Sequence, residues 1–85
     1  MRVKSFDIEF MHGRRKRSAQ VNVYPRAVSP LKCPMYRVFV PEKDGSGTVF
    51  ILYDVKGEKE RFFWYANQDA VMSNGIAKAL NKASG

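Results

Sequence analysis

Cysteine is nearly absent from this chain of 85 residues, in which Cys33 stands alone. One cysteine excludes an internal disulfide, so the sequence favours a reducing compartment and we expect a cytoplasmic protein. Long apolar runs are absent too. The longest, at residues 48–53 and 62–66, fall far below the roughly 18 to 20 residues that span a bilayer. We therefore expect no transmembrane helix and no membrane partner. Polar residues at positions 5, 7 and 9 also argue against a signal peptide.

Motifs for catalysis and metal binding are missing as well. The sequence has no Gly-rich phosphate loop followed by Lys and Ser or Thr, and no Gly-x-Ser-x-Gly elbow. His12 is the only histidine, and Asp7 and Glu9 nearby give too few ligands for a metal site. Cys33 has no histidine in its own segment to act as a base, so a half-buried structural thiol is favoured. We expect a protein that is not an enzyme, with no catalytic residue, no metal and no cofactor.

Negative charge is scarce in the first part of the chain. Residues 1–40 contain nine Lys or Arg and two Asp or Glu, whereas residues 41–85 contain six of each kind. The whole net charge of +7 therefore resides in the first part. This asymmetry indicates a polyanionic partner, nucleic acid before a membrane surface, because no segment has the pattern of a basic amphipathic helix.

Alternating apolar and polar residues predict a β-hairpin near the N-terminus. Residues 5–11 and 18–24 each alternate, which is typical of strands with one buried face. The apolar side chains are Phe6, Ile8 and Phe10 in the first strand, and Ala19, Val21 and Val23 in the second. We predict a Gly-containing connection, roughly over residues 13–17, that is longer than the tightest two-residue turns.

Three further strands are predicted after a Pro-rich segment. Prolines at 25, 30 and 34 predict an irregular crossing loop, because proline lacks the N–H that a strand ladder needs. Residues 36–40 alternate again and precede a Gly-rich turn at 43–47. Residues 49–55 and 62–66 carry apolar side chains on both faces, so we expect strands that are central or covered on both sides. A hairpin turn at residues 56–58 would join them.

The last part of the chain has the apolar spacing of an amphipathic helix. Its stripe consists of Met72, Ile76, Ala79, Leu80 and Ala83. The sequence leaves the start open within residues 67–75. Asn67 with Asp69 is one start, and Ser73 or Asn74 is another. Gly75 favours the later start, since an interior Gly costs about 1 kcal/mol relative to Ala.

Together these elements predict a single α+β domain over residues 1–85. It would be a two-layer structure, with a five-stranded antiparallel meander sheet packed by one C-terminal amphipathic helix. We expect the helix to cover the face of Phe6, Ile8 and Phe10. The other face would then retain apolar residues of the later strands. The Pro-rich loop, a second subunit or a ligand must cover it, because large apolar patches are unusual on monomers.

Four consecutive cations at the predicted hairpin tip are the strongest functional signal. Clustered Arg and Lys on a protruding hairpin neutralise phosphates, whereas the alternative is a solvated loop with extra charge. Two more cations extend the track if they share that surface, and one tyrosine on the polar side of the second strand is available for stacking. The candidate nucleic-acid-binding residues are thus Arg14, Arg15, Lys16, Arg17, Tyr24, Arg26 and Arg37.

The aromatic run at residues 62–65 must send two rings to each face of its strand. Exposed rings beside cations would stack on unpaired bases. Burial of both pairs, one under the helix and one under a loop or second subunit, is the alternative. The sequence favours burial, because aromatic residues dominate small cores.

Two functional hypotheses follow. The first is a small non-enzymatic domain that binds single-stranded DNA or RNA through the basic tip and adjacent cations. The second is a protein-interaction or homodimerisation module that uses the apolar sheet face, with an acidic protein or a second copy as partner and no nucleic-acid binding. The order of elements is similar to that of the repeating unit of the Whirly and PUR single-strand-binding families. This resemblance is one of topology and supplies no site residue.

Overall fold

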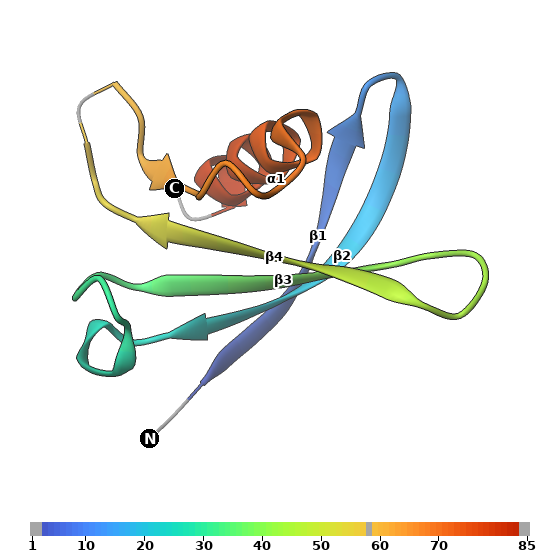
Figure 1. Cartoon of the computed structure of the whole chain (residues 1–85). Coiled ribbons are helices and arrows are strands. Elements are labelled where there is room, and N and C mark those ends of the chain that lie inside the picture. The colour runs from blue at the N-terminus through green and yellow to red at the C-terminus, as the bar shows by residue number, and fades with distance from the viewer. Residues whose placement is uncertain (1–2, 58, 84–85) are drawn as a thin grey trace.

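The structure, a computed structural model, describes residues 3–57 and 59–83. One antiparallel sheet has the strand order β1-β2-β3-β4-β5, and one helix packs on one of its faces (Figure 1). The strands are β1 (Lys4–His12), β2 (Arg15–Tyr24), β3 (Met35–Pro41), β4 (Gly47–Asp54) and β5 (Phe62–Phe63), and the helix is α1 (Ala70–Ala83). The predicted two-layer α+β fold, a meander sheet with a C-terminal helix, is confirmed.

The connection between β1 and β2 is tighter than predicted. β1 ends at His12 and β2 begins at Arg15, and these two residues pair, so the turn consists of Gly13 and Arg14 alone. Gly13 has a φ of 65°. A type II′ turn requires this left-handed conformation at its first central position, and glycine adopts it without steric cost. The prediction of a wider connection was wrong, and the cations after Arg14 belong to the strand.

The Pro-rich segment between β2 and β3 lies at one end of the sheet (Figure 1). It contains a 3-10 turn, η1 (Arg26–Val28), and its apolar side chains Val28 and Leu31 stay exposed. Because β2 and β3 are neighbours in the sheet, the segment crosses no other strand. The segment lies beyond the ends of these strands, and Phe39 and Phe63 on the second sheet face stay exposed.

The fifth strand is short and lies at the edge of the sheet. β5 pairs only with the end of β4, through Tyr53 with Phe63 and Asp54 with Phe62. The prediction of a central or doubly covered strand over residues 62–66 was wrong. The apolar residues of β5 lie on both faces of the sheet: Phe62 is buried in the core, and Phe63 is exposed on the other side. The predicted turn before it includes residue 58, which lies outside the described residues.

Beyond β5 the side chain of Gln68 forms a hydrogen bond to the backbone of β4 at its edge. Its Oε1 accepts the N–H of Ile51 at 2.7 Å, and its Nε2 donates to the Ser73 hydroxyl of α1 at 3.2 Å. This amide therefore joins the edge strand to the helix where strand pairing stops.

Asp69 caps the N-terminus of α1. Its Oδ1 accepts the N–H of Met72 at 2.9 Å, as an N-cap side chain does. The helix begins at Ala70, within the predicted range and close to the earlier start, but Asp69 and not Asn67 is the cap, and the favoured later start was wrong. Gly75 lies inside the helix for a packing reason: a β-carbon there would collide with the carbonyl oxygen of Met11 in β1.

The core lies between α1 and the predicted sheet face. Strand register places its members on one face, since Ile8 pairs with Ala19, and Val38 pairs with both Val21 and Phe50. The buried cluster consists of Ile8, Phe10, Ala19, Val21, Tyr36, Val38, Val40, Phe50, Leu52, Phe62, Met72, Ile76 and Leu80. The predicted helix stripe is confirmed except at its end, where Ala83 is exposed.

Candidate nucleic-acid interface

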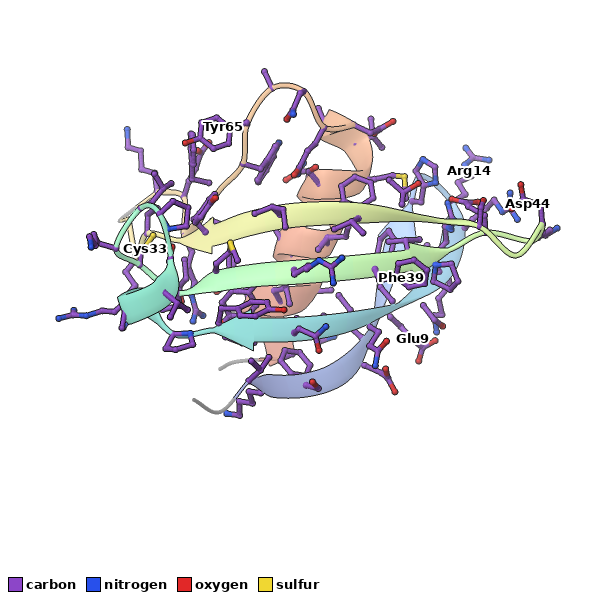
Figure 2. The ribbon with its side chains drawn as sticks, turned by 60° about the horizontal axis from the view of Figure 1, so that its bottom comes forward. Glu9, Arg14, Cys33, Phe39, Asp44 and Tyr65 are labelled. Carbon is purple, nitrogen blue, oxygen red and sulfur yellow. The ribbon has the colours of Figure 1, made fainter. Side chains whose placement is uncertain are left out.

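The sheet face opposite α1 carries exposed aromatic rings (Figure 2). Phe39 in β3, Phe63 in β5 and Tyr65 just after β5 are 38%, 41% and 50% exposed. Phe39 and Phe63 share this face because their partners in β4, Val49 and Tyr53, are four residues apart on one strand. We call this surface the open face. It consists of Tyr24, Met35, Arg37, Phe39, Val49, Ile51, Tyr53, Phe63 and Tyr65, and polar side chains of β1 and β2 border it on the same side of the sheet: Asp7, Glu9, Ser18, Gln20 and Asn22.

Three of these rings form a cluster. The ring centroids of Phe63 and Tyr65 are 5.0 Å apart and those of Tyr53 and Tyr65 are 6.2 Å apart, both in edge-to-face geometry. Tyr53 is buried by its neighbours, and burial raises the pKa of its phenol, with smaller contributions from Tyr65 and Cys33. Phe63 and Tyr65 thus rest on a buried ring and present their own surfaces to solvent.

A cation lies in the middle of this face. Arg37 in β3 is exposed and pairs with Asn22 on one side and Ile51 on the other. The next outward-facing residue of β3 is Phe39, so a guanidinium and an exposed ring are neighbours on one strand. Arg guanidinium groups and aromatic rings are the usual stacking partners of unpaired bases.

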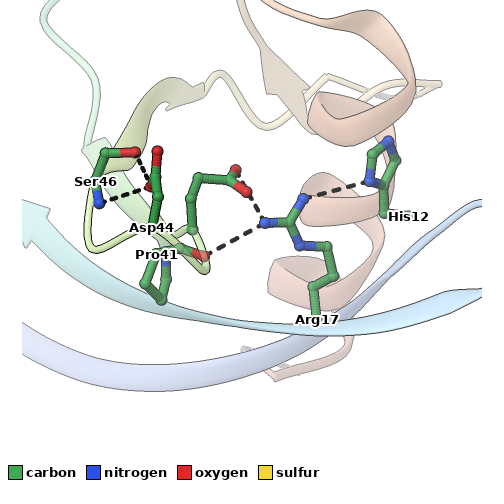
Figure 3. Close-up of polar contacts among 6 residues, drawn as sticks. His12, Arg17, Pro41, Asp44 and Ser46 are labelled. Carbon is green, nitrogen blue, oxygen red and sulfur yellow. Dashed lines mark hydrogen bonds and ion pairs between the residues drawn. The ribbon is translucent and has the colours of Figure 1, made fainter.

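At the hairpin tip, Arg17 is committed to contacts within the protein (Figure 3). Its Nη2 lies 3.0 Å from Oε1 of Glu42 and donates to the Pro41 carbonyl at 3.3 Å. Its Nη1 lies 3.5 Å from Nδ1 of His12. The side chain is half-buried, so its charge is neutralised on site and fastens the first hairpin to the end of β3.

The other three tip cations are exposed. Lys16 approaches Glu9 at 3.9 Å, a long ion pair between exposed groups that is worth little. Arg14 lies in the turn and Arg15 opens β2, and neither has an ion-pair partner among the described residues. Arg14, Arg15 and Lys16 therefore form the solvent-facing part of the tip.

Acidic residues reach the same end of the sheet from the turn between β3 and β4 (Figure 2). Asp44 is occupied within this turn: its Oδ1 accepts the Ser46 N–H at 3.0 Å and the Ser46 hydroxyl at 2.5 Å. These hydrogen bonds lower the pKa of Asp44, the hydroxyl contributing most. With Glu42 bound to Arg17, both turn carboxylates have partners, and Lys43 adds one more exposed cation.

The predicted cations do not converge on the tip. Arg26 belongs to η1, which follows β2 at the end opposite the turn. Ten extended residues separate these ends by about 30 Å. Tyr24, half-buried, also lies at the η1 end of the open face, and Arg37 lies between the two ends. The predicted residues thus bracket the open face instead of forming one cluster.

Sequence reasoning missed the exposed rings as site residues. The split of residues 62–65 between two faces is confirmed, since Phe62 is buried and Trp64 packs against the core while Phe63 and Tyr65 are exposed. In the described chain the second pair has no cover, contrary to the favoured prediction. The available signal was Phe39, which alternates with buried Val38 and Val40 and so had to face away from the helix.

A buried ion pair between Asp54 and Arg61 stabilises the fold and is not part of the candidate interface. Asp54 is buried at the end of β4, and Arg61 donates to both of its oxygens, at 3.3 and 3.0 Å. Arg61 also donates to Asn81 of α1 and lies over the Phe62 ring. The carboxylate raises the pKa of Arg61, and burial followed by Asp54 raises that of Tyr36. This network ties the β4–β5 turn to the helix.

Over the described ranges, no group of three or more His, Cys, Asp or Glu side chains has the geometry of a metal site. Over the same ranges, no helix has both the length and the apolar content needed to cross a bilayer. Comparisons with protein families, with curated proteins and with solved structures find no match to this chain. The topological resemblance to single-strand-binding families therefore stays an expectation.

Proposed function

We propose that this protein binds single-stranded DNA or RNA across the open face. The observation that carries the proposal is the row of exposed rings, Phe39, Phe63 and Tyr65, on the uncovered side of the sheet with Arg37 among them. Flat rings accept any base by stacking, and a guanidinium among them adds cation–π contact and phosphate neutralisation.

Cations at both ends of the open face would contact a nucleic-acid strand that crosses this face lengthwise. Arg14, Arg15 and Lys16 lie at the tip end, and Arg26 lies at the η1 end. In this arrangement they neutralise phosphates where the strand enters and leaves. Arg17 supports the site by fixing the two hairpins together, because its charge already serves Glu42. The tip thus offers three cations to phosphates, Arg14, Arg15 and Lys16, and not four.

The test is a fluorescence anisotropy titration of a labelled oligonucleotide of about 12 nucleotides, single-stranded or duplex. The single strand is expected to bind more tightly than the duplex, with affinity that falls steeply between about 50 and 200 mM salt. Phe63→Ala with Tyr65→Ala should weaken binding by about 1 to 3 kcal/mol for each base that loses a ring.

The matched control is Val71→Ala, which removes an exposed apolar side chain from α1 on the other side of the sheet. It should leave affinity unchanged. Absence of binding at low salt, or a preference for duplex, would contradict the proposal.

A second candidate function is self-association through the same face. It is favoured by the apolar character of the open face, where Val49, Ile51 and the ring cluster adjoin and the charged groups are Arg37 and, at the β1 border, Asp7 and Glu9. Light scattering coupled to size exclusion tests it. A dimer that persists at high salt, that Phe63→Ser disrupts and that binds no oligonucleotide would support this function in place of the first.

The compartment proposed for either function is the cytoplasm, where the free, half-buried thiol of Cys33 stays reduced.

A further inference from the structure

A groove between β1 and α1 brings together lysines that are far apart in the sequence. Lys16 comes from the first hairpin, while Lys78 and Lys82 come from successive turns of the helix, and all three are exposed. The residues that line the groove are Glu9, Phe10, Met11, Gly13, Lys16, Val71, Asn74, Gly75, Lys78, Ala79 and Lys82. The juxtaposition depends on Gly75, which lets the helix backbone approach Met11 of β1.

The floor of the groove is apolar and open to solvent. Met11 is 49% exposed and Val71 is 60% exposed, with Ala79 further along the helix. Exposed aliphatic side chains offer no stacking surface for bases, and the one aromatic residue in the lining, Phe10, is buried in the core. The groove therefore differs in chemistry from the open face, which has exposed rings and an arginine.

The charge around the groove is mostly positive. Glu9 is the one acid in the described lining, and Lys16 already lies 3.9 Å from it. Within α1 the charged residues are Lys78 and Lys82 alone. Lys78 also borders a second groove on the opposite flank of the helix, where Lys59 and Arg61 accompany Glu60 and where Arg61 is already paired with Asp54. The groove beside β1 is thus the more basic flank of α1, with three lysines and one acid, which complements an acidic partner.

One edge of the groove is formed by β1, which the helix touches at Met11. β1 is the first strand of the sheet, so alternate residues direct their backbone N–H and C=O groups away from β2. One of these groups, the Met11 carbonyl, faces Gly75 of α1, so a partner segment in the groove is held by its side chains and not by added strand pairing. The lining includes residues 9–11 of β1 and extends along α1 from residue 71 to residue 82, about 17 Å, enough for about five extended residues of a partner.

We infer that this groove is a docking site for an extended acidic segment of a partner protein, with apolar side chains placed on Met11 and Val71 and carboxylates paired with Lys16, Lys78 and Lys82. The inference does not rest on the proposed nucleic-acid function, because Lys78, Lys82 and Val71 belong to the helix and not to the open face, and Lys16 alone is common to both surfaces.

The experiment is an anisotropy titration of the full chain with a labelled peptide of about nine residues in which Glu and Leu alternate. The Glu–Leu peptide is expected to bind. A Lys–Leu peptide is expected not to bind, and a Glu–Ser peptide to bind about tenfold more weakly or worse. Lys78→Glu with Lys82→Glu should weaken binding of the Glu–Leu peptide by about tenfold or more.

Matched controls separate the groove from net charge and from folding. Lys4→Glu with Lys32→Glu makes the same charge change at exposed sites outside the groove lining and should retain peptide affinity. Met11→Gln with Val71→Gln keeps every charge and should also weaken binding, with circular dichroism showing that each variant stays folded.

Three results would overturn the inference. They are no peptide binding up to about 1 mM, equal binding of the Glu–Ser peptide, and displacement of the peptide by a single-stranded oligonucleotide from a Lys16→Gln variant, which lacks the one cation that both surfaces share. The last result would assign the groove to the nucleic-acid surface. Loss of oligonucleotide binding with peptide binding intact would contradict only the proposed function of the open face.

Discussion

The guanidinium of Arg17 lies 3.0 Å from the carboxylate of Glu42, so one of the four tip cations closes the gap between the first hairpin and the β3–β4 turn. Both residues are half-buried. An ion pair in this position stabilises the protein and removes one charge from the surface offered to a ligand. The tip cations are therefore not equivalent.

This difference predicts how salt acts on the tip variants. Arg14→Gln, Arg15→Gln and Lys16→Gln should each lower the slope of log affinity against log salt by about 0.7, the value for one phosphate contact on a single strand. Arg17→Gln should leave the slope unchanged and lower stability instead. Anisotropy titrations at several salt concentrations measure the slopes. Equal slope changes for all four variants would contradict the assigned role of Arg17.

Gly75→Ala should destabilise the protein although alanine favours helices. The added methyl group meets the Met11 carbonyl, so α1 must shift away from β1. Forcing an extra carbon into a packed contact costs about 1 to 3 kcal/mol, more than the roughly 1 kcal/mol gained in helix propensity. Urea unfolding measures the change. Asn74→Ala, at the exposed neighbouring position of the same helix, is the control and should be neutral or stabilising.

Arg61→Met should lower the free energy of unfolding by roughly 2 to 4 kcal/mol, because it leaves the buried Asp54 carboxylate without its charged donor. The double variant with Asp54→Asn should recover part of this loss, since no buried charge then remains. Urea unfolding of the single and double variants measures both values. A double variant less stable than Arg61→Met would show that the pair matters less than the separate packing of each side chain.

Alkaline pH should weaken the fold through two buried phenols. The pKa values of Tyr36 and Tyr53 are raised above the ordinary value of 10.0, mainly by burial. Below that value both the folded and unfolded chains keep these protons. Above it the phenols of the unfolded chain ionise first, so the contribution of the two protonated tyrosines to the free energy of unfolding is lost as pH rises through the folded-state pKa. Urea unfolding from pH 9 upward should show a steeper decline for the natural sequence than for Tyr36→Phe with Tyr53→Phe.

Periodicity predicted the sheet, the helix and the core face. The order of apolar and polar residues reflects which side chains are buried, and burial repeats every second residue in a strand and about every 3.6 residues in a helix. Periodicity failed where a single contact decides the outcome. The turn at Gly13 is tighter than expected because a Gly-x pair suffices for a type II′ turn. The interior Gly75 is tolerated because the helix must approach Met11.

The candidate site was harder to predict than the fold. Arg14, Arg15 and Lys16 stand out in the sequence and are exposed in the structure. The neutralisation of Arg17 depends on Glu42, a residue 25 positions away in the chain. The groove lysines were missed for the same reason, since Lys16 is separated from Lys78 by most of the chain and only the packing of α1 beside β1 joins them.

Nuclear magnetic resonance titration with a single-stranded oligonucleotide tests the central claim most directly. The account predicts that backbone amide shifts concentrate on the open face, at Arg37, Phe39, Val49 and Phe63, with smaller shifts at the tip and none along α1. Shifts confined to the tip or to α1, or no shifts at low salt, would contradict nucleic-acid binding by the open face.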